Sequence, residues 1–317
     1  MVSAVRVASP TEGRNPRTLE IDTLPTLEVL ELLNDEDARV APAVRAVLPE
    51  LARAVDAAVE RYRAGGTIHY FGAGTSGRLA TLDAAELPPT FSADPARTVA
   101  HHAGGAAALV QAAENVEDRP AAGREAAATV TSRDVAVGVA ASGRTPFVIG
   151  ALEAAREAGA FTVFVSSAPP GPATEFVDVY LFVDTGPEAI AGSTRLKAGT
   201  AQKLVLNSFS TALMIRLGKT YSNLMVDVTR HNAKLRGRVE VIVEEATGAD
   251  ADACRRALDE AGGDTKTAIV SLLADTDATT ARAALEATDR RVRDALVVLR
   301  ASPDQSTATI DEVPMEQ

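Results

Sequence analysis

The residues best suited to bind an anion lie in the glycine-rich segment GAGTSG at residues 72–77. Only small residues fit so tight a turn, and Thr75 and Ser76 add hydroxyl groups beside Gly77. A β-prone run, residues 67–71, precedes the turn, and an apolar stripe of helical spacing follows it. A turn that opens a helix leaves backbone N–H groups unpaired at the positive end of the helix dipole, so this segment could hold a phosphate group.

The same segment also satisfies the pattern G-x-G-x-x-G, which predicts dinucleotide binding when an acidic residue closes the next strand. The next β-prone run, residues 97–101, ends in His101 and is followed by His102, so the acidic residue is missing. The sequence has no G-x-x-x-x-G-K-[ST] motif, which argues against a nucleoside triphosphate. A single phosphate monoester fits the segment better, and a tight turn without a ligand stays the alternative.

A second loop of small and hydroxyl-bearing residues predicts the same kind of site. Residues 134–140 are nearly all apolar, as is typical of a strand buried on both faces of a parallel sheet. They lead into Ser142, Gly143 and Thr145, and Pro146 fits the first turn of the helix that follows. Because both loops follow strands of one expected sheet, they could face one sugar phosphate.

Strands and helices alternate through the middle of the chain, which predicts an α/β fold with a parallel sheet flanked by helices on both faces. The helix after the first loop is expected to stop at the paired prolines Pro88 and Pro89. The five expected strands are residues 67–71, 97–101, 134–140, 161–166 and 179–184. The main further helices are expected at residues 105–116, 121–129 and 196–217.

Composition limits the partners and the compartment. The net charge of −11 and the pI near 5.0 argue against nucleic acid, whose phosphates need a basic surface. An anionic substrate would therefore need local donors against a repulsive overall field. The single cysteine, Cys254, excludes an internal disulfide and fits a reducing cytoplasm. No apolar run is long enough to span a membrane, and residues 1–17 lack the apolar stretch of a signal peptide, so we expect a cytoplasmic protein without membrane contact.

We expect no metal site. The chain has four histidines and one cysteine, and they form no cluster with the spacing of metal ligands. His101 and His102 are adjacent, and adjacent side chains of a strand point to opposite faces of the sheet.

Four stretches of the chain resemble the N-acetylmuramic acid 6-phosphate etherase family of the sugar isomerase domain superfamily. They are GAGTSGRLATLDAAELPPTF, VGVAASGRTPFVI, GPEAIAGSTRLKAGTAQKLVLN and GKTYSNLMVDV. The resemblance runs from about residue 19 to the helical region beyond residue 268. It implies cleavage of the D-lactyl ether of N-acetylmuramic acid 6-phosphate by elimination followed by hydration, in amino-sugar recycling, with no cofactor.

The resemblance also implies residue roles. Glu86 and Glu117 match the two catalytic glutamates of the family, with Glu86 as the acid that protonates lactate and Glu117 assisting proton transfer at C2. Glu188, Ser193 and Lys197 lie in the long middle motif and are expected to contact the sugar or a second subunit, with structural packing as an equal alternative. A homodimer is expected.

The domain organisation is predicted from changes in composition and helical pattern along the chain, together with the resemblance. Residues 1–17 are expected to form a mobile arm, residues 18–245 a sugar isomerase domain with N-terminal helices, residues 246–300 a small three-helix module and residues 301–317 a disordered tail.

Two other functions remain open from the sequence. An aldose–ketose isomerase on the same fold would also move a C2 proton, but it would need no group to protonate a leaving oxygen at C3. A non-catalytic sugar-phosphate sensor is the second alternative, because a regulator of glucokinase resembles this family; that regulator carries two tandem copies of the domain.

Overall fold

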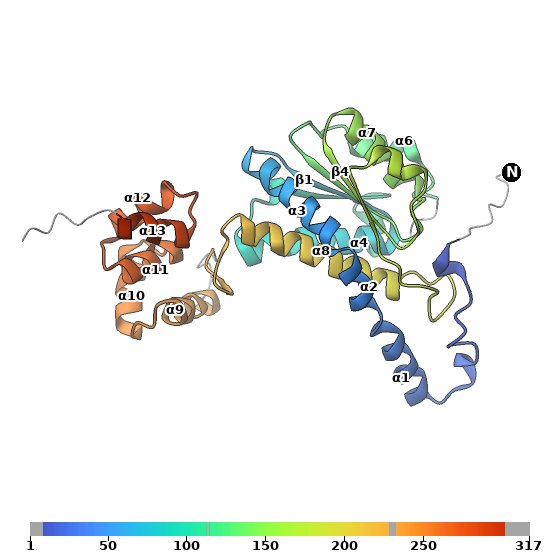
Figure 1. The fold of residues 1–317 in the computed structure, drawn as a ribbon, viewed down its shortest axis with the longest axis horizontal. Helices are drawn as coiled ribbons and strands as arrows, with labels where there is room; N and C mark the ends of the chain where they lie inside the picture. The colour runs from blue at the N-terminus through green and yellow to red at the C-terminus, as the bar shows by residue number, and fades with distance from the viewer. Residues whose placement is uncertain (1–8, 112, 114, 228–232, 302–317) are drawn as a thin grey trace, which may run out of the picture. The chain divides into compact units, whose positions relative to one another are not determined.

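The computed structural model describes residues 9–111, 113, 115–227 and 233–301 (Figure 1). The chain divides into two compact units, Met1–Leu217 and Gly218–Gln317. The first unit contains the sheet and both glycine-rich loops, and the second is mostly helical.

The first unit is built on a sheet of five parallel strands in the order β2-β1-β3-β4-β5, which confirms the predicted α/β class. In register, Gly72 at the end of β1 lies between His102 of β2 and Val139 of β3. The strands agree with the predicted ones to within two residues at each end: β1 Ile68–Gly72, β2 Thr98–His102, β3 Val135–Val139, β4 Phe161–Ser166 and β5 Val179–Phe182.

Helices cover both faces of the sheet because successive strand residues point to opposite sides. Val135, Val137 and Val139 belong to one buried cluster with α3, α4 and α8, and Ala136 belongs to another with α7. Figure 1 shows α6 and α7 on the side of the sheet opposite α3 and α8. These helices are α3 Leu48–Arg63, α4 Gly74–Phe91, α6 Pro120–Ala126, α7 Pro146–Glu157 and α8 Lys197–Arg216.

Two helix predictions were wrong near the first loop. α4 does not stop at the prolines: it runs on to Phe91, and the Ser92 N–H closes the last turn on the Pro88 carbonyl. Pro88 and Pro89 have no N–H group, so the helical hydrogen bonds to the carbonyls of Ala84 and Ala85 are missing, but the helix ends within two residues of them. Among the described residues, the helix expected at residues 105–116 is reduced to α5, Ala107–Val110: the backbone is extended at Gln111, with ψ of 135°, and the Arg78 side chain donates to the carbonyl oxygens of Ala108 and Leu109.

The N-terminal helices pack beside α8. These are α1 Thr26–Asp37 and α2 Val40–Ala46. Residues 9–17, expected to belong to a mobile arm, are instead held by the protein: Asn15 and Arg17 both donate to the buried carboxylate of Glu36 in α1. Residues 1–8 of the expected arm lie outside the described residues.

The second unit has its own apolar core, formed by α9 to α13. α9 contributes Val239 and Val243 to it, although residues up to 245 were expected to belong to the first domain. The last part of the expected three-helix module is two helices, α12 and α13, because Asp289 and Arg290 take left-handed conformations between them. The elements are β6 Thr220–Tyr221, β7 Leu224–Met225, α9 Ala233–Thr247, α10 Ala251–Glu260, α11 Thr265–Ala274, α12 Ala278–Glu286 and α13 Val292–Ala301.

The expected tail, residues 301–317, lies outside the described residues except for Ala301. Among the described residues, no helix combines the length and the apolar character needed to cross a bilayer.

Candidate active site

The strand order reverses between β1 and β3, which is where open α/β sheets form a crevice. From β1 the chain passes to β2 on one side, and the later strands are added on the other side. In open α/β sheets, ligands bind outside the carboxyl ends of the strands at this point of reversal. α4 begins directly after β1 and α7 begins shortly after β3, so residues 73–77 and 141–145 flank the crevice. The structure therefore brings the two predicted phosphate loops to one place.

The first loop presents its free N–H groups at the start of α4. Gly77 donates the first helical hydrogen bond, to Ala73 at 3.1 Å, so the N–H groups of Gly74, Thr75 and Ser76 precede the helical ladder. Ala73 provides no side-chain cap. Gly77 is required by close packing, because a Cβ at this position would lie 2.6 Å from the Gly72 oxygen. The arrangement suits an anion held by amides and hydroxyls.

The second loop is shaped by a left-handed glycine. Gly143 has φ of 67°, and Ser142 Oγ accepts from the Arg144 N–H at 3.3 Å. Thr145 is the N-cap residue of α7, but its side chain makes no capping hydrogen bond. The Thr145 hydroxyl therefore remains available to a ligand at the positive end of α7.

Glu117 lies between the two loops. Its carbonyl accepts from the Phe147 N–H at 3.0 Å, which fixes it beside the first turn of α7. Glu117 also lines a cavity of about 370 Å³ together with Gly74 and Arg78 of α4 and His102 of β2. This predicted catalytic residue therefore lies close to both predicted phosphate loops.

Glu86 lies elsewhere on α4. It follows Ser76 by ten residues, which corresponds to about 15 Å along a helix axis. Glu86 is exposed, and it is not among the described residues that line the cavity of Glu117. One chain therefore does not bring the two predicted catalytic glutamates together.

Known proteins similar to this chain decide its family. Residues 50–156 match the model of the glucokinase regulatory protein N-terminal SIS domain. The N-acetylmuramic acid 6-phosphate etherase of Thermobifida fusca (strain YX) is 61% identical over 267 residues, which cover 84% of this chain and 88% of that protein. The chain belongs to the N-acetylmuramic acid 6-phosphate etherase family.

A second etherase agrees with this assignment. The etherase of Symbiobacterium thermophilum is 53% identical over 265 residues, covering 83% of this chain and 88% of that one. Among solved structures, a phosphoheptose isomerase from Francisella tularensis has a TM-score of 0.48 at 18% identity and covers 60% of this chain and 98% of its own.

The middle motif of this etherase family member is held mainly by protein contacts. Glu188 is fully buried and accepts from the N–H groups of Lys197 and Ala198, both at 3.0 Å, and burial raises its pKa. Lys197 Nζ lies 2.6 Å from Glu36 Oε2, and both side chains are buried. These contacts favour the packing alternative for Glu188 and Lys197.

Ser193 lies in the turn before α8, where its N–H bonds to the Ile190 oxygen and its carbonyl accepts from Leu196. The start of α8 also reaches the first phosphate loop, because a Cβ added at Gly199 would lie 3.5 Å from Thr75 Cγ2. The start of α8, within the middle motif, therefore lies beside the first loop.

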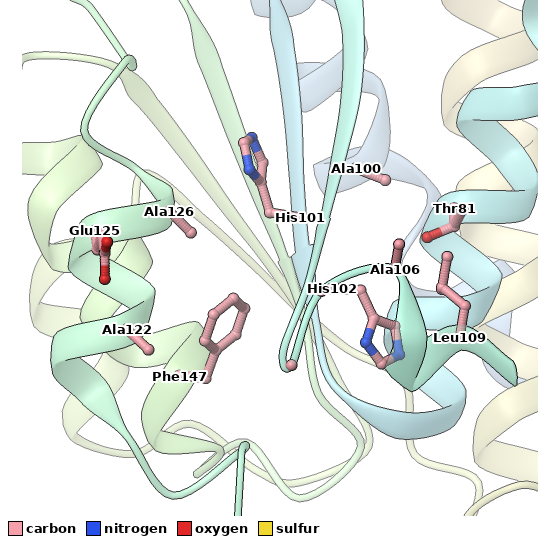
Figure 2. A pocket seen from close by; sticks show the side chains of 12 residues that line it. Thr81, Ala100, His101, His102, Ala106, Leu109, Ala122, Glu125, Ala126 and Phe147 are labelled. Atoms are coloured by element: carbon pink, nitrogen blue, oxygen red, sulfur yellow. The ribbon is translucent and has the colours of Figure 1, made fainter. Parts of the chain in front are cut away.

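The sequence analysis missed a histidine pair beside the site. His69 Nδ1 and His101 Nε2 lie 3.0 Å apart, and His69 Nε2 is 3.9 Å from Asp134 Oδ2. Burial lowers the pKa of His69 and lowers that of His101 to about 4. His101 lines a second cavity of about 590 Å³, and Figure 2 shows its ring and that of His102 on opposite sides of β2. The adjacent His101 and His102 were the signal that the sequence offered for this pair. His69 lies beside His101 only because β1 pairs with β2.

A buried carboxylate behind the site was also missed. Asp83 of α4 accepts from Tyr70 Oη at 2.9 Å and from Ser210 Oγ at 2.9 Å. Burial raises the pKa of Asp83 to about 6 despite these two donors. Asp83 lies one turn before Glu86 but on the buried side of the helix, so it ties α4 to β1 and α8.

Proposed function

We propose that this member of the etherase family cleaves the D-lactyl ether of N-acetylmuramic acid 6-phosphate, giving N-acetylglucosamine 6-phosphate and D-lactate in amino-sugar recycling. The observation that carries the proposal is the 61% identity to an etherase over 84% of the chain. The crevice geometry supports it, since two loops suited to a phosphate adjoin a glutamate in a cavity. An isomerase is not favoured, because the similarity to etherases covers most of the chain.

The chemistry requires proton transfers rather than hydrolysis of an unactivated ether. In the open-chain sugar the ether oxygen on C3 is β to the C1 aldehyde. A base removes the proton on C2, the C3–O bond breaks, and the departing lactate oxygen takes up a proton. Water then adds across the double bond, its oxygen going to C3 and a proton to C2. The site must therefore hold the phosphate, move protons at C2 and C3, and stabilise the enolate.

The phosphate is assigned to the two loops. The N–H groups at the start of α4 and the hydroxyls of Thr75 and Ser76 provide donors on one side, with Gly77 permitting the close turn. Ser142, Gly143 and Thr145 provide the opposite side of the same site. The assignment rests on the paired ends of β1 and β3, which place both loops at the reversal point of the sheet.

Glu117 is assigned to proton transfer at C2 and Glu86 to protonation of lactate and activation of water. Glu117 adjoins the phosphate loops of its own chain. Glu86 lies too far along α4 to act in the same cavity, so we assign it to the site of a second copy. This assignment makes the homodimer part of the catalytic account.

The exposed side of α4 supports such a dimer. Leu82 is 51% exposed and lies one helical turn before Glu86, on the same face of the helix. Apolar surface beside a catalytic group suits contact with another subunit, and two-fold pairing is the commonest form of association. α8 is a weak reason for pairing, because Leu206 and Leu213 are buried within the chain.

The test is release of D-lactate from N-acetylmuramic acid 6-phosphate, followed with D-lactate dehydrogenase. We expect wild-type turnover, and a loss of about 10²- to 10⁴-fold in Glu86→Gln, which keeps size and removes the titratable carboxyl. Formation of a ketose from hexose phosphates without lactate release would favour the isomerase instead. We also propose a cytoplasmic location, consistent with Cys254 being a buried free thiol.

A further inference from the structure

A cation with spare donors faces the cavity of Glu117. Arg78 is half-buried; its Nε donates to the Leu109 oxygen at 2.8 Å and its Nη2 to the Ala108 oxygen at 2.9 Å. Both acceptors are neutral carbonyls, and no carboxylate pairs with Arg78 in the described part of the chain. A guanidinium has five N–H donors, so its positive charge and part of its hydrogen-bonding capacity remain for a ligand.

The other group in this cavity that can carry positive charge is already engaged. His102 has its Nδ1 2.7 Å from the Ala103 oxygen and its Nε2 3.2 Å from the Gly74 oxygen. Its ring also packs against Gly77, since a Cβ there would lie 2.5 Å from His102 Cδ2. Among the described lining residues, Arg78 is therefore the cation that can turn toward a ligand.

Arg78 lies on a different side of α4 from the second phosphate loop. Its guanidinium reaches toward α5, which follows the edge strand β2, whereas Ser142 and Thr145 follow β3 on the other side of β1. Glu117 lines the same cavity as Arg78 and Gly74, the first residue of α4. The cavity thus brings a guanidinium that pairs with no described carboxylate together with the first phosphate loop.

We propose that Arg78 binds the lactyl carboxylate of the substrate and so determines specificity for an acidic leaving group. The inference rests on the proposed function, whose substrate carries an anion at each end. The loops account for the phosphate and leave the carboxylate without a partner. A planar guanidinium matches a carboxylate in two parallel hydrogen bonds. In a chain of net charge −11, a second anion needs such a local cation.

The test compares N-acetylmuramic acid 6-phosphate with its lactyl carboxamide, which keeps the phosphate and the ether but loses the negative charge. Wild-type kcat/KM should favour the acid by about 10- to 100-fold, the range for a hydrogen bond to a charged group. Arg78→Met should reduce this preference to about 2-fold or less. It should also abolish inhibition by D-lactate while leaving inhibition by N-acetylglucosamine 6-phosphate within about 3-fold of wild type, because that product has no carboxylate.

Matched controls separate this role from folding and from phosphate binding. Arg144→Met removes the exposed guanidinium of the second loop and should keep the acid preference. Arg78→Lys keeps a charge, so it should retain a reduced preference, and it serves as the test if Arg78→Met melts at a clearly lower temperature.

Equal wild-type use of acid and carboxamide would overturn the inference, as would an unchanged preference in Arg78→Met. An equal loss of N-acetylglucosamine 6-phosphate affinity in Arg78→Met would assign Arg78 to the phosphate and also overturn it. Failure of the wild-type enzyme to release lactate from either compound would instead refute the proposed function.

Discussion

The histidine pair and the buried aspartate should give the stability of the chain two opposing dependences on pH. His101 has a folded-state pKa of about 4 against its ordinary 6.5, so the unfolded chain takes up a proton first as the pH falls. Stability from this group is complete above pH 6.5 and is lost as the pH falls toward 4. Between pH 7 and pH 5 the loss amounts to about 2 kcal/mol in the free energy of unfolding.

Asp83 acts in the opposite direction. Its folded-state pKa of about 6 lies above the ordinary 3.8, so the folded chain takes up a proton first as the pH falls. Its contribution is complete below pH 3.8 and is lost as the pH rises through 6. Between pH 7 and pH 5 it adds about 1 kcal/mol, which partly offsets the loss from His101 in the wild-type protein.

Substitution separates the two groups. Urea unfolding followed by circular dichroism at pH 7 and pH 5 gives the difference in free energy of unfolding for each variant. His101→Phe keeps the ring stack on Phe71, whose centroid is 4.6 Å away. In this variant the free energy of unfolding at pH 5 minus that at pH 7 should be about 2 kcal/mol higher than in wild type. Asp83→Asn should lower it by about 1 kcal/mol. Equal pH differences in wild type and His101→Phe would refute the reasoning.

Three further outcomes are expected. Ser76→Ala and Ser142→Ala should each raise KM more than they lower kcat, because each loses about 1.5–3 kcal/mol of binding free energy, the range for a hydrogen bond to a charged group. An unchanged KM in steady-state kinetics would contradict the phosphate assignment. Lys197→Met should lower the free energy of unfolding by about 3 kcal/mol in urea titrations because it leaves a buried carboxylate short of a partner, and a loss within about 0.5 kcal/mol would contradict this. Co-expressed Glu86→Gln and Glu117→Gln chains should regain roughly a quarter of wild-type activity, since a mixed two-fold dimer keeps one intact site; no recovery would place both residues in one chain's site.

The fold was largely predictable because its signals are local. β1 and β3 are short apolar runs bounded by small residues. Each is followed by a loop whose glycines and hydroxyl-bearing residues indicate the start of a helix. Periodicity likewise located α8 to within a residue at each end. These features depend on neighbours in sequence, so composition and spacing reveal them.

The misses arose where distant contacts override local preference. α5 ends at an extended Gln111, and its carbonyl oxygens accept from Arg78, a contact across about thirty residues that no periodicity reveals. Residues 9–17 are fixed by the carboxylate of Glu36, which is buried among partners that are remote in sequence, and these donors lower its pKa to about 2. Acidic residues of this kind look like solvated surface until the fold is known.

The candidate site was predicted in its parts but not in its assembly. Spacing alone placed both candidate phosphate loops at helix starts, and only the strand order shows that they follow neighbouring strands at one edge of the sheet. Glu86 and Glu117 came from family resemblance, since each is otherwise one of 43 acidic residues. The absence of Glu86 from the described lining of the cavity that Glu117 lines, and the pairing of His69 with His101, could be known only from the structure.

The most direct test of elimination followed by hydration is the fate of isotopes from solvent. Wild-type enzyme is given N-acetylmuramic acid 6-phosphate in ²H₂O, and in a parallel reaction in H₂¹⁸O, and both products are analysed by mass spectrometry and NMR. The account predicts deuterium at C2 and ¹⁸O at C3 of N-acetylglucosamine 6-phosphate, with unlabelled D-lactate. Oxygen label in lactate, or a sugar product without deuterium at C2, would contradict it.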